Sequence, residues 1–334
     1  MVDLLDACRP RFTSATRGHV ESYFLRANHP TERKAFWLKA TIFKPLHGPA
    51  IAETWAIVFD GADRFAERET VPLESARFRG SPPRIEAAKL EIHVDGDGVA
   101  KGSVSGPTGR AEIDLAWTVE AGSLGAPLCL LPLESLLDGP FPKSKLLTPY
   151  PSLVFRGQIS APGRTFAIDG WHGMLGHNWG KEHAHEYLWG QCNFLDGSGT
   201  AASAEAFTAR IKVGPVVSPR ISALVVRTRG HEYRFERLYD LWRQKVWTDE
   251  LYWSLRMRSD VAEASLTMRT SWSEVVCLGY DSPNGKRSFC VNSKLAKSTL
   301  ELRAPGENRT FVSAHGGAFE LLSGTYDARA GRVV

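Results

Sequence analysis

Short segments of alternating apolar and polar residues, separated by turn sequences, run along most of this 334-residue chain. A period of two residues is typical of a β-strand with one face turned to a core. Turn signals such as Asp60-Gly61 and Asn284-Gly285 separate these segments. Strands are predicted at residues 36–43, 53–59, 89–94, 112–117, 187–194, 206–213, 221–228, 232–236, 264–269 and 318–322. The pattern predicts an all-β sandwich or barrel, with short helices only at 2–9 and 132–138.

The length of the chain suits one large domain or two ordinary ones. A proline-rich region at residues 139–151 interrupts the predicted strands, either as a linker or as a long crossing loop. Strands resume at Ser152 and continue into the densest motif of the chain, so we place the boundary after that motif. The predicted domains are residues 1–185 and 186–334.

Composition excludes several classes of protein. The net charge of +4 is spread along the chain without a run of five or six Lys or Arg, so no nucleic-acid partner is expected. The five cysteines form no C-x-x-C pair, which indicates reduced thiols and a cytoplasmic setting. The acidic start of the chain is unlike a signal peptide, and no stretch approaches 18 apolar residues. At most transient membrane contact is expected.

The densest motif, at residues 171–186, holds four of the ten histidines and three glycines. Within it, His177, Asn178 and Trp179 offer an imidazole, an amide and an indole in succession. An imidazole acts as a general acid or base near neutral pH, and an indole holds an apolar ligand. The alternative is a glycine-rich bend fixed by buried histidine and asparagine hydrogen bonds.

His183 and His185 are two residues apart and would share one face of a strand, which is one geometry for metal ligands. Glu186 follows immediately, and only His231 and His315 remain downstream as a third histidine ligand. A metal-dependent enzyme is therefore the least favoured alternative, and no metal or other cofactor is predicted.

Polar residues also alternate with aromatic residues near the start of the chain. In an extended strand Tyr23 faces one way, whereas Arg26 and Asn28 face the other. A charged residue that faces into a barrel must be paired with an opposite charge or take part in binding or reaction. Pairing alone would explain Arg26, Lys39 and Glu53. A weaker signal of the same kind is the segment 290–296, in which Asn292 precedes Ser293 and a lysine.

Together these motifs resemble the carotenoid 1,2-hydratase (hydroxyneurosporene synthase) and AttH-like superfamily. The resemblance lies in residues 173–180, which end in His-Asn-Trp-Gly, in residues 21–30, and in the late Asn-Ser-Lys at 292–294. Tocopherol cyclases and fungal Diels–Alderases are similar at a greater distance. The resemblance implies two tandem lipocalin-like (calycin) antiparallel barrels, with a hydrophobic pocket in or between them. It also implies action on polyenes, prenylated quinols or polyketides without a redox cofactor.

One position departs from the hydratases, which carry an aspartate as proton donor directly before the His-Asn-Trp-Gly stretch. This chain has Gly176 there, so another group would have to donate the proton. The acid candidates are His177, Glu182, Glu53 and Glu205. The chain lacks a Rossmann fingerprint, a Walker loop, a G-x-S-x-G elbow and an H-E-x-x-H motif.

The sequence thus predicts a cofactor-independent cyclase, isomerase or hydratase-type enzyme for a lipophilic terpenoid or polyketide. Acid catalysis and conformational templating in an aromatic-lined pocket would drive the reaction. The alternative is a non-catalytic carrier of a hydrophobic small molecule. The predicted catalytic residues are His177, Glu53 and Glu182. The predicted substrate-binding residues are Tyr23, Arg26, Asn28, Trp37, Lys39, Trp55, Asn178, Trp179, Glu205 and Asn292.

Overall fold

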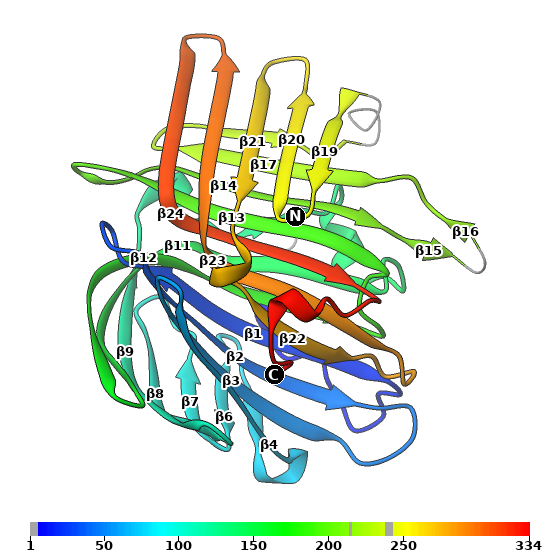
Figure 1. Ribbon diagram of the computed structural model, residues 1–334. Helices are drawn as coiled ribbons and strands as arrows, with labels where there is room; N and C mark the ends of the chain where they lie inside the picture. Colours follow the sequence, from blue (N-terminus) through cyan, green and yellow to red (C-terminus); the bar gives the residue numbers. More distant parts are fainter. Residues whose placement is uncertain (1–5, 214–215, 238–242) are drawn as a thin grey trace.

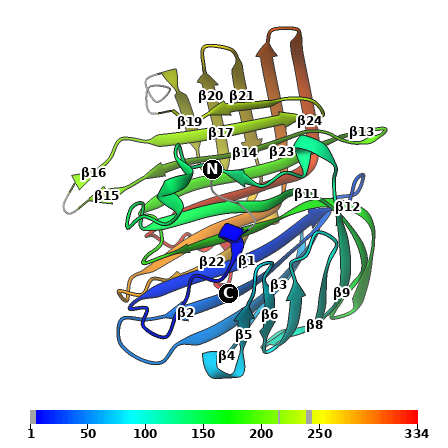
Figure 2. The ribbon, with the colours of Figure 1, turned by 180° about the vertical axis from the view of Figure 1, so that it is seen from behind.

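The computed structural model describes residues 6–213, 216–237 and 243–334, and places nearly all of its regular structure in two large antiparallel sheets (Figures 1 and 2). Helical segments in the described part are 3-10 turns of three or four residues. They are η1 (Asp6–Cys8), η2 (Leu73–Ser75), η3 (Gly122–Leu124), η4 (Glu134–Leu137), η6 (Trp272–Glu274) and η7 (Ala328–Ala330). The predicted all-β class is therefore confirmed.

The first sheet has twelve strands in the order β4-β3-β2-β1-β12-β11-β9-β8-β7-β6-β5, with β10 on β11. Its strands are β1 (His19–Asn28), β2 (Lys34–Lys44), β3 (Ile51–Asp60), β4 (Asp63–Pro72), β5 (Arg77–Arg79), β6 (Arg84–Ala87), β7 (Lys89–His93), β8 (Gly98–Gly106), β9 (Gly109–Val119), β10 (Leu128–Cys129), β11 (Ser144–Ala161) and β12 (Arg164–Gly180). The sheet curls strongly, so that β6 to β9 turn over the inner face of β1 to β3 (Figure 1).

The curl of the first sheet is closed by both polar and apolar contacts. Glu67 and Glu69 of β4 accept hydrogen bonds from the backbone amides of Thr108 and Ser105, each at 3.0 Å. Apolar side chains such as Phe36, Trp117 and Phe155 fill the space inside the curl. The inside of the curled first sheet is thus a core of packed apolar side chains.

The second sheet has ten strands in the order β18-β17-β14-β13-β24-β23-β21-β20-β19, with β22 on β23. A separate hairpin joins β15 to β16. The strands are β13 (Glu186–Asp196), β14 (Gly199–Arg210), β15 (Lys212–Val213), β16 (Val216–Val217), β17 (Ile221–Thr228), β18 (Glu232–Phe235), β19 (Lys245–Asp249), β20 (Tyr252–Arg258), β21 (Glu263–Arg269), β22 (Val276–Asp281), β23 (Arg287–Ala304) and β24 (Glu307–Ser323). The chain passes from one sheet to the other between Gly180 and Glu186. The domain boundary after residue 185 stays a prediction.

The proline-rich region is mostly strand, which corrects the expectation of a linker or crossing loop. β11 begins at Ser144 and continues through Pro149 and Pro151. The register of β11 against β12 shifts between Leu147 and Tyr150 and again before Leu153. Proline lacks the N–H that a ladder requires, so it is accommodated where the pairing is irregular.

The two predicted helices, at residues 2–9 and 132–138, correspond at most to short 3-10 turns in the described part of the chain. η4 lies within the predicted 132–138 segment. Of the predicted helix at 2–9, residues 2–5 lie outside the described residues, and Asp6–Cys8 form the single turn η1. No helix in the described ranges has the length and apolar character needed to cross a membrane.

All ten residues of β1 are buried because both of its faces are covered. Tyr23, Leu25 and Ala27 belong to the core of the first barrel. Phe24 belongs to a different core, which also contains Trp189 of β13 and lies between the two sheets. The outer face of β1 to β3 and β12 therefore packs against the second sheet.

Arg26 and Asn28 of β1 tie the two sheets together. The Arg26 guanidinium donates to the backbone carbonyls of Gln191 and Gly316, both at 3.1 Å. The Asn28 amide donates to the carbonyls of Lys294 and His315 at 2.5 and 2.9 Å. Arg26 and Asn28 are themselves joined by a 2.6 Å hydrogen bond. Two side chains of the first sheet thereby donate to four backbone carbonyls of the second sheet.

We expect Arg26→Met to lower the free energy of unfolding by about 3 kcal/mol, because it leaves buried carbonyl groups without donors. Urea denaturation would measure this, with Arg110→Met as the control because that side chain is 50% exposed. An Arg26→Met variant as stable as the control would contradict the structural role of Arg26.

Candidate functional site

The face between the sheets gathers several of the side chains that the sequence analysis selected. Antiparallel register places Lys39 of β2 opposite Trp55 of β3, and Thr41 opposite Glu53. Because alternate residues of a strand share a face, Trp37, Lys39, Glu53 and Trp55 all point toward the second sheet. We call these four residues, together with Arg68, His183, Tyr280, Lys294 and Glu320, the interdomain site.

Lys39 is the central cation of the interdomain site. Its Nζ lies 4.2 Å from the ring centroid of Tyr280, 5.6 Å from that of Trp55 and 5.7 Å from that of Trp37. Burial lowers the pKa of Lys39 to about 8, and nearby Glu53 and Glu320 partly oppose this shift. Cation–π contacts thus replace part of the hydration that the ammonium group loses.

Glu53 is the acidic partner at the same place. Burial raises the pKa of its carboxyl, and the positive charges of Arg68 and Lys39 oppose the rise. Arg68 contacts Glu53 at 3.4 Å and lies over the Trp55 ring at 4.7 Å. A carboxyl whose pKa is raised by burial holds its proton to a higher pH than an exposed glutamate, as a general acid requires.

A small cavity of about 40 Å³ opens beside these groups. Lys39, Glu53, Arg68, His183 and Tyr280 are among its lining residues. A space of this size holds little more than one water molecule. A larger ligand would have to displace lining side chains, of which Arg68 is 26% exposed.

The second sheet contributes a second buried lysine, and this one is fully paired. Lys294 Nζ donates to Glu320 Oε1 at 2.8 Å and lies 5.6 Å from the ring centroids of Trp37 and Trp189. Asn292 donates to the same carboxylate oxygen at 2.8 Å. Lys294 and Glu320 form a buried ion pair with additional hydrogen bonds, as burial of charge requires.

Glu205 lies elsewhere on the same intersheet face. Its Oε1 accepts hydrogen bonds from Thr148 at 2.9 Å and from the Trp189 indole at 3.1 Å. Its Oε2 is buried with no partner among the described residues. Burial raises the pKa of Glu205 to about 7, so the carboxyl is partly protonated near neutral pH.

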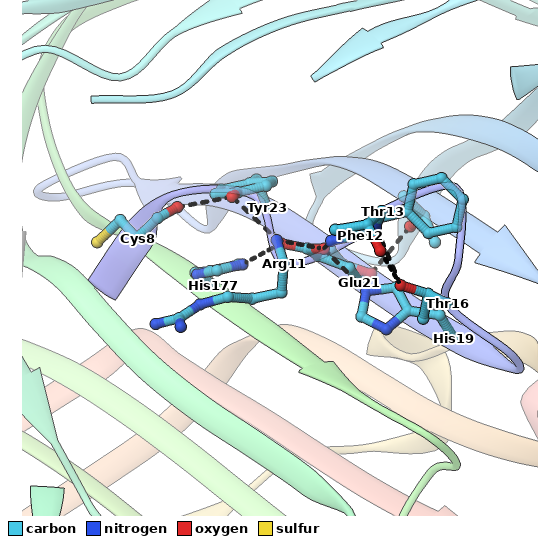
Figure 3. A network of polar contacts seen from close by, with 11 residues as sticks. Cys8, Arg11, Phe12, Thr13, Thr16, His19, Glu21, Tyr23 and His177 are labelled. Atoms are coloured by element: carbon cyan, nitrogen blue, oxygen red, sulfur yellow. Dashed lines mark hydrogen bonds and ion pairs between the residues drawn. The ribbon is translucent and has the colours of Figure 1, made fainter. Parts of the chain in front are cut away.

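His177 lies on the other face of the first sheet, in a polar network with Glu21 and Tyr23 of β1 (Figure 3). Its Nε2 lies 2.8 Å from Glu21 Oε1, and its ring stacks on Tyr23 at 4.1 Å and on Trp179 at 4.6 Å. His177 is fully buried, and burial lowers its pKa. The His-Asn-Trp motif therefore divides between the two faces, since Asn178 points toward the second sheet.

The N-terminal segment packs against this polar network and supplies hydrogen bonds to it. Glu21 accepts hydrogen bonds from the backbone amides of Arg11 and Phe12 and lies 2.8 Å from His19 Nε2. The Tyr23 hydroxyl donates to the carbonyl of Cys8 at 2.6 Å. Burial raises the pKa of Glu21, but the hydrogen bonds and charge interactions with His177 and His19 outweigh burial and bring it to about 2. The arrangement has the geometry of a buried structural network.

The structure thus divides the predicted site residues into three groups. Those on the intersheet face are Arg26, Asn28, Trp37, Lys39, Glu53, Trp55, Asn178, Glu205 and Asn292. Tyr23, His177 and Trp179 lie on the inner face of the first barrel. Glu182 is paired with Lys143 at 2.9 Å on the surface. The assignment of roles to these residues stays a prediction.

Sequence reasoning missed four members of the interdomain site. Arg68, Tyr280 and Glu320 lie in segments without a motif, and Lys294 was noted only as part of Asn-Ser-Lys. The buried strand pattern at 318–322, with a single glutamate at position 320, is the signal that could have drawn attention to Glu320.

Gly176, where hydratases carry an aspartate, adjoins Phe24 of β1. A Cβ atom on Gly176 would lie 2.2 Å from Cζ of the Phe24 ring. The ring therefore occupies the space of the missing side chain and packs edge-on against Trp189, with centroids 5.9 Å apart. Apolar packing thus fills the place where the resemblance led us to expect an acidic side chain.

The two histidines considered as metal ligands are in different surroundings. The His183 ring stacks on Tyr280 at 5.1 Å, and burial lowers its pKa to about 3. His185 is exposed. Within the described ranges, no three His, Cys, Asp or Glu side chains are grouped so that they could hold a metal ion.

We expect acid to destabilise the fold through Glu21 and His177. The pKa of Glu21 is about 2 in the folded protein and 4.5 as the ordinary value. The unfolded chain therefore binds more protons, and stability present above about pH 5 is lost as the pH falls toward 2, by about 3 kcal/mol. The lowered pKa of His177 acts in the same direction below about pH 6.5.

Measuring the free energy of unfolding between about pH 7 and pH 2 would show this slope. Glu21→Gln should flatten it, whereas Glu112→Gln, at a side chain that is 54% exposed, should leave it unchanged. Equal slopes in the wild type and Glu21→Gln would count against the network.

Comparison with known proteins places the fold but not the activity. No family model matches the sequence. Uncharacterized proteins from two strains of Mycobacterium tuberculosis, CDC 1551 / Oshkosh and H37Rv, are 24% identical over 300 residues, which cover 89% of this chain and 84% of each relative.

Among solved structures, CghA with Sch210972 is 11% identical with a TM-score of 0.61, covering 92% of this chain and 90% of that one. Kievitone hydratase from Nectria haematococca is 13% identical with a TM-score of 0.55 and covers 97% and 93%. A protein assigned as AttH from Nitrosomonas europaea is 14% identical with a TM-score of 0.54 and covers 92% and 93%. The chain therefore has the AttH-like tandem-barrel fold.

Proposed function

We propose that this protein is an enzyme that binds a lipophilic, carbonyl-bearing small molecule at the interdomain site and cyclises, isomerises or hydrates it without a redox cofactor. The observation that carries the proposal is the juxtaposition of Glu53, whose pKa is raised by burial, and the desolvated Lys39 at one cavity. A carboxyl with a raised pKa and a buried amine, both beside aromatic rings, are typical of acid–base sites.

The charges favour a carbonyl substrate over an alkene that becomes a cation. A positive charge developing about 5 Å from protonated Lys39 would be disfavoured by about 3 kcal/mol at an effective dielectric constant of 20. Contact with one aromatic face would stabilise that positive charge by only about 0.5–2 kcal/mol. Negative charge developing on a carbonyl oxygen is instead stabilised, by about 3 kcal/mol for one well-placed donor.

In this mechanism Glu53 supplies a proton to the carbonyl oxygen and Lys39 polarises it. The flat faces of Trp37, Trp55 and Tyr280 hold the apolar part of the substrate in one conformation, which removes part of the entropic barrier. Arg68 and His183 must move aside for binding because the cavity is about 40 Å³. Two proteins of the same fold, kievitone hydratase and CghA with Sch210972, support a small-molecule substrate.

The test is conversion of a panel of polyenes and polyketide cyclisation precursors that carry a ketone or aldehyde, followed by chromatography and mass spectrometry. Wild-type protein should form product, and Glu53→Gln should be at least about 100-fold slower. Glu112→Gln is the matched control on an exposed strand position. Circular dichroism would verify that each variant is folded.

Two outcomes would contradict the proposal. Loss of turnover in a folded His177→Gln variant, with Glu53→Gln unaffected, would place the reaction inside the first barrel. A compound that co-purifies with the protein, and is recovered unchanged from native mass spectrometry after long incubation, would favour a carrier.

A further inference from the structure

We infer that Lys39 is a nucleophile whose Nζ forms an imine with the carbonyl group of the substrate at the interdomain site. The inference deepens the proposed function and rests on it, since it assigns covalent chemistry to the same cavity. It also narrows the substrate to aldehydes and ketones.

The first step is the difference between Lys39 and the other buried lysines. Lys294 Nζ is bound to Glu320 at 2.8 Å, and Lys145 Nζ donates to the carbonyl of Pro142 at 2.7 Å. Lys39 is equally buried, but within the described part of the chain its Nζ makes neither a hydrogen bond nor an ion pair. Its contacts are three aromatic faces. A largely buried amine that faces a cavity and not a protein acceptor is suited to bind or react with a ligand there.

The second step is access. Lys39 lines the cavity between the sheets, and so does Glu53. Tyr280 of β22 lies on one side of the amine and Trp55 of β3 on another. A carbonyl carbon entering this cavity would therefore meet the amine and a carboxyl together.

The third step is the charge around the amine. The charged and titratable groups that face Lys39 or line its cavity are Glu53 on β3, Arg68 on β4, His183 in the connection between the sheets, Tyr280 and Asp281 on β22, Cys290 and Lys294 on β23, and Glu320 on β24. Burial outweighs the negative charges and brings the pKa of Lys39 to about 8. The neutral, nucleophilic amine is thus far more populated near neutral pH than in an exposed lysine.

The reaction balances with the groups at hand. Neutral Nζ attacks the carbonyl carbon, the carbonyl π electrons pass to oxygen, and oxygen takes a proton from Glu53 while nitrogen loses one to water. The proton that water received returns to Glu53, which then protonates the hydroxyl group of the carbinolamine. This group leaves as water while the nitrogen lone pair forms the C=N bond, leaving a protonated imine beside the Glu53 carboxylate. The imine draws electrons from the α-carbon and eases loss of its proton, and hydrolysis later restores the amine. The imine cation takes over the aromatic contacts of the ammonium group.

The test is reductive trapping on the full chain with acetaldehyde and sodium cyanoborohydride, followed by peptide mass spectrometry. At about pH 7.5, Lys39 should gain an N-ethyl group at least about tenfold faster than Lys101, whose side chain is 61% exposed. The labelling rate of Lys39 should rise with pH and reach half its maximum near 8.

Lys39→Arg should abolish the fast labelling, whereas Lys101→Arg should leave it intact. Labelling of Lys39 no faster than that of Lys101 would overturn the inference. If Lys39 is not trapped but Glu53→Gln still loses turnover, the inference of an imine is wrong and the proposed function is still supported. If Lys39 is trapped but no carbonyl substrate is converted, the amine is confirmed and the proposed function fails.

Discussion

Burial of both faces of β1 to β3 is the constraint on which the rest of the structure depends. One face of these strands fills the first barrel, and the other packs on the second sheet. Most polar residues on the second face are consequently shielded from water and depend on contacts within the protein. Arg26 and Asn28 find theirs in backbone carbonyls of the second sheet. Lys39 finds aromatic faces instead, and this difference separates residues that hold the sheets together from one available for chemistry.

The two buried acid clusters illustrate the same distinction. Glu21 accepts hydrogen bonds from two backbone amides and has two histidines beside it, so its pKa falls to about 2 despite burial. Glu53 has only a long 3.4 Å contact with Arg68 and weaker interactions with Lys39 and Trp55, so burial dominates and its pKa rises. A carboxylate that accepts several hydrogen bonds has a lowered pKa and stabilises the fold. A carboxyl with few donors has a pKa raised by burial and is suited to act as an acid. This contrast led us to the interdomain site and away from His177.

Much of the fold follows from sequence period. Alternation in β2 and β3 predicted strands, and the faces of Arg26 and Asn28 follow from the same period of two. The prediction of a linker or crossing loop at the proline-rich region was wrong because Pro149 and Pro151 lie inside β11, where register shifts accommodate them. The division of His177 from Asn178 depends on which sheet covers which face, and no local pattern shows that. Tyr280, Lys294 and Glu320 reach Lys39 or its tryptophans across a sequence separation of more than 200 residues, so only the packed structure brings them together.

The central claim is that the Lys39 amine is held between the two sheets against aromatic rings, with no hydrogen-bond acceptor for it among the described residues. Nuclear magnetic resonance of protein carrying lysine labelled with carbon-13 at Cε measures this directly, with Lys39→Arg to assign the resonance. We predict that the Lys39 resonance titrates with a midpoint near 8. A midpoint at the ordinary value of 10.5 would show that the amine is solvated or paired, and would contradict the account.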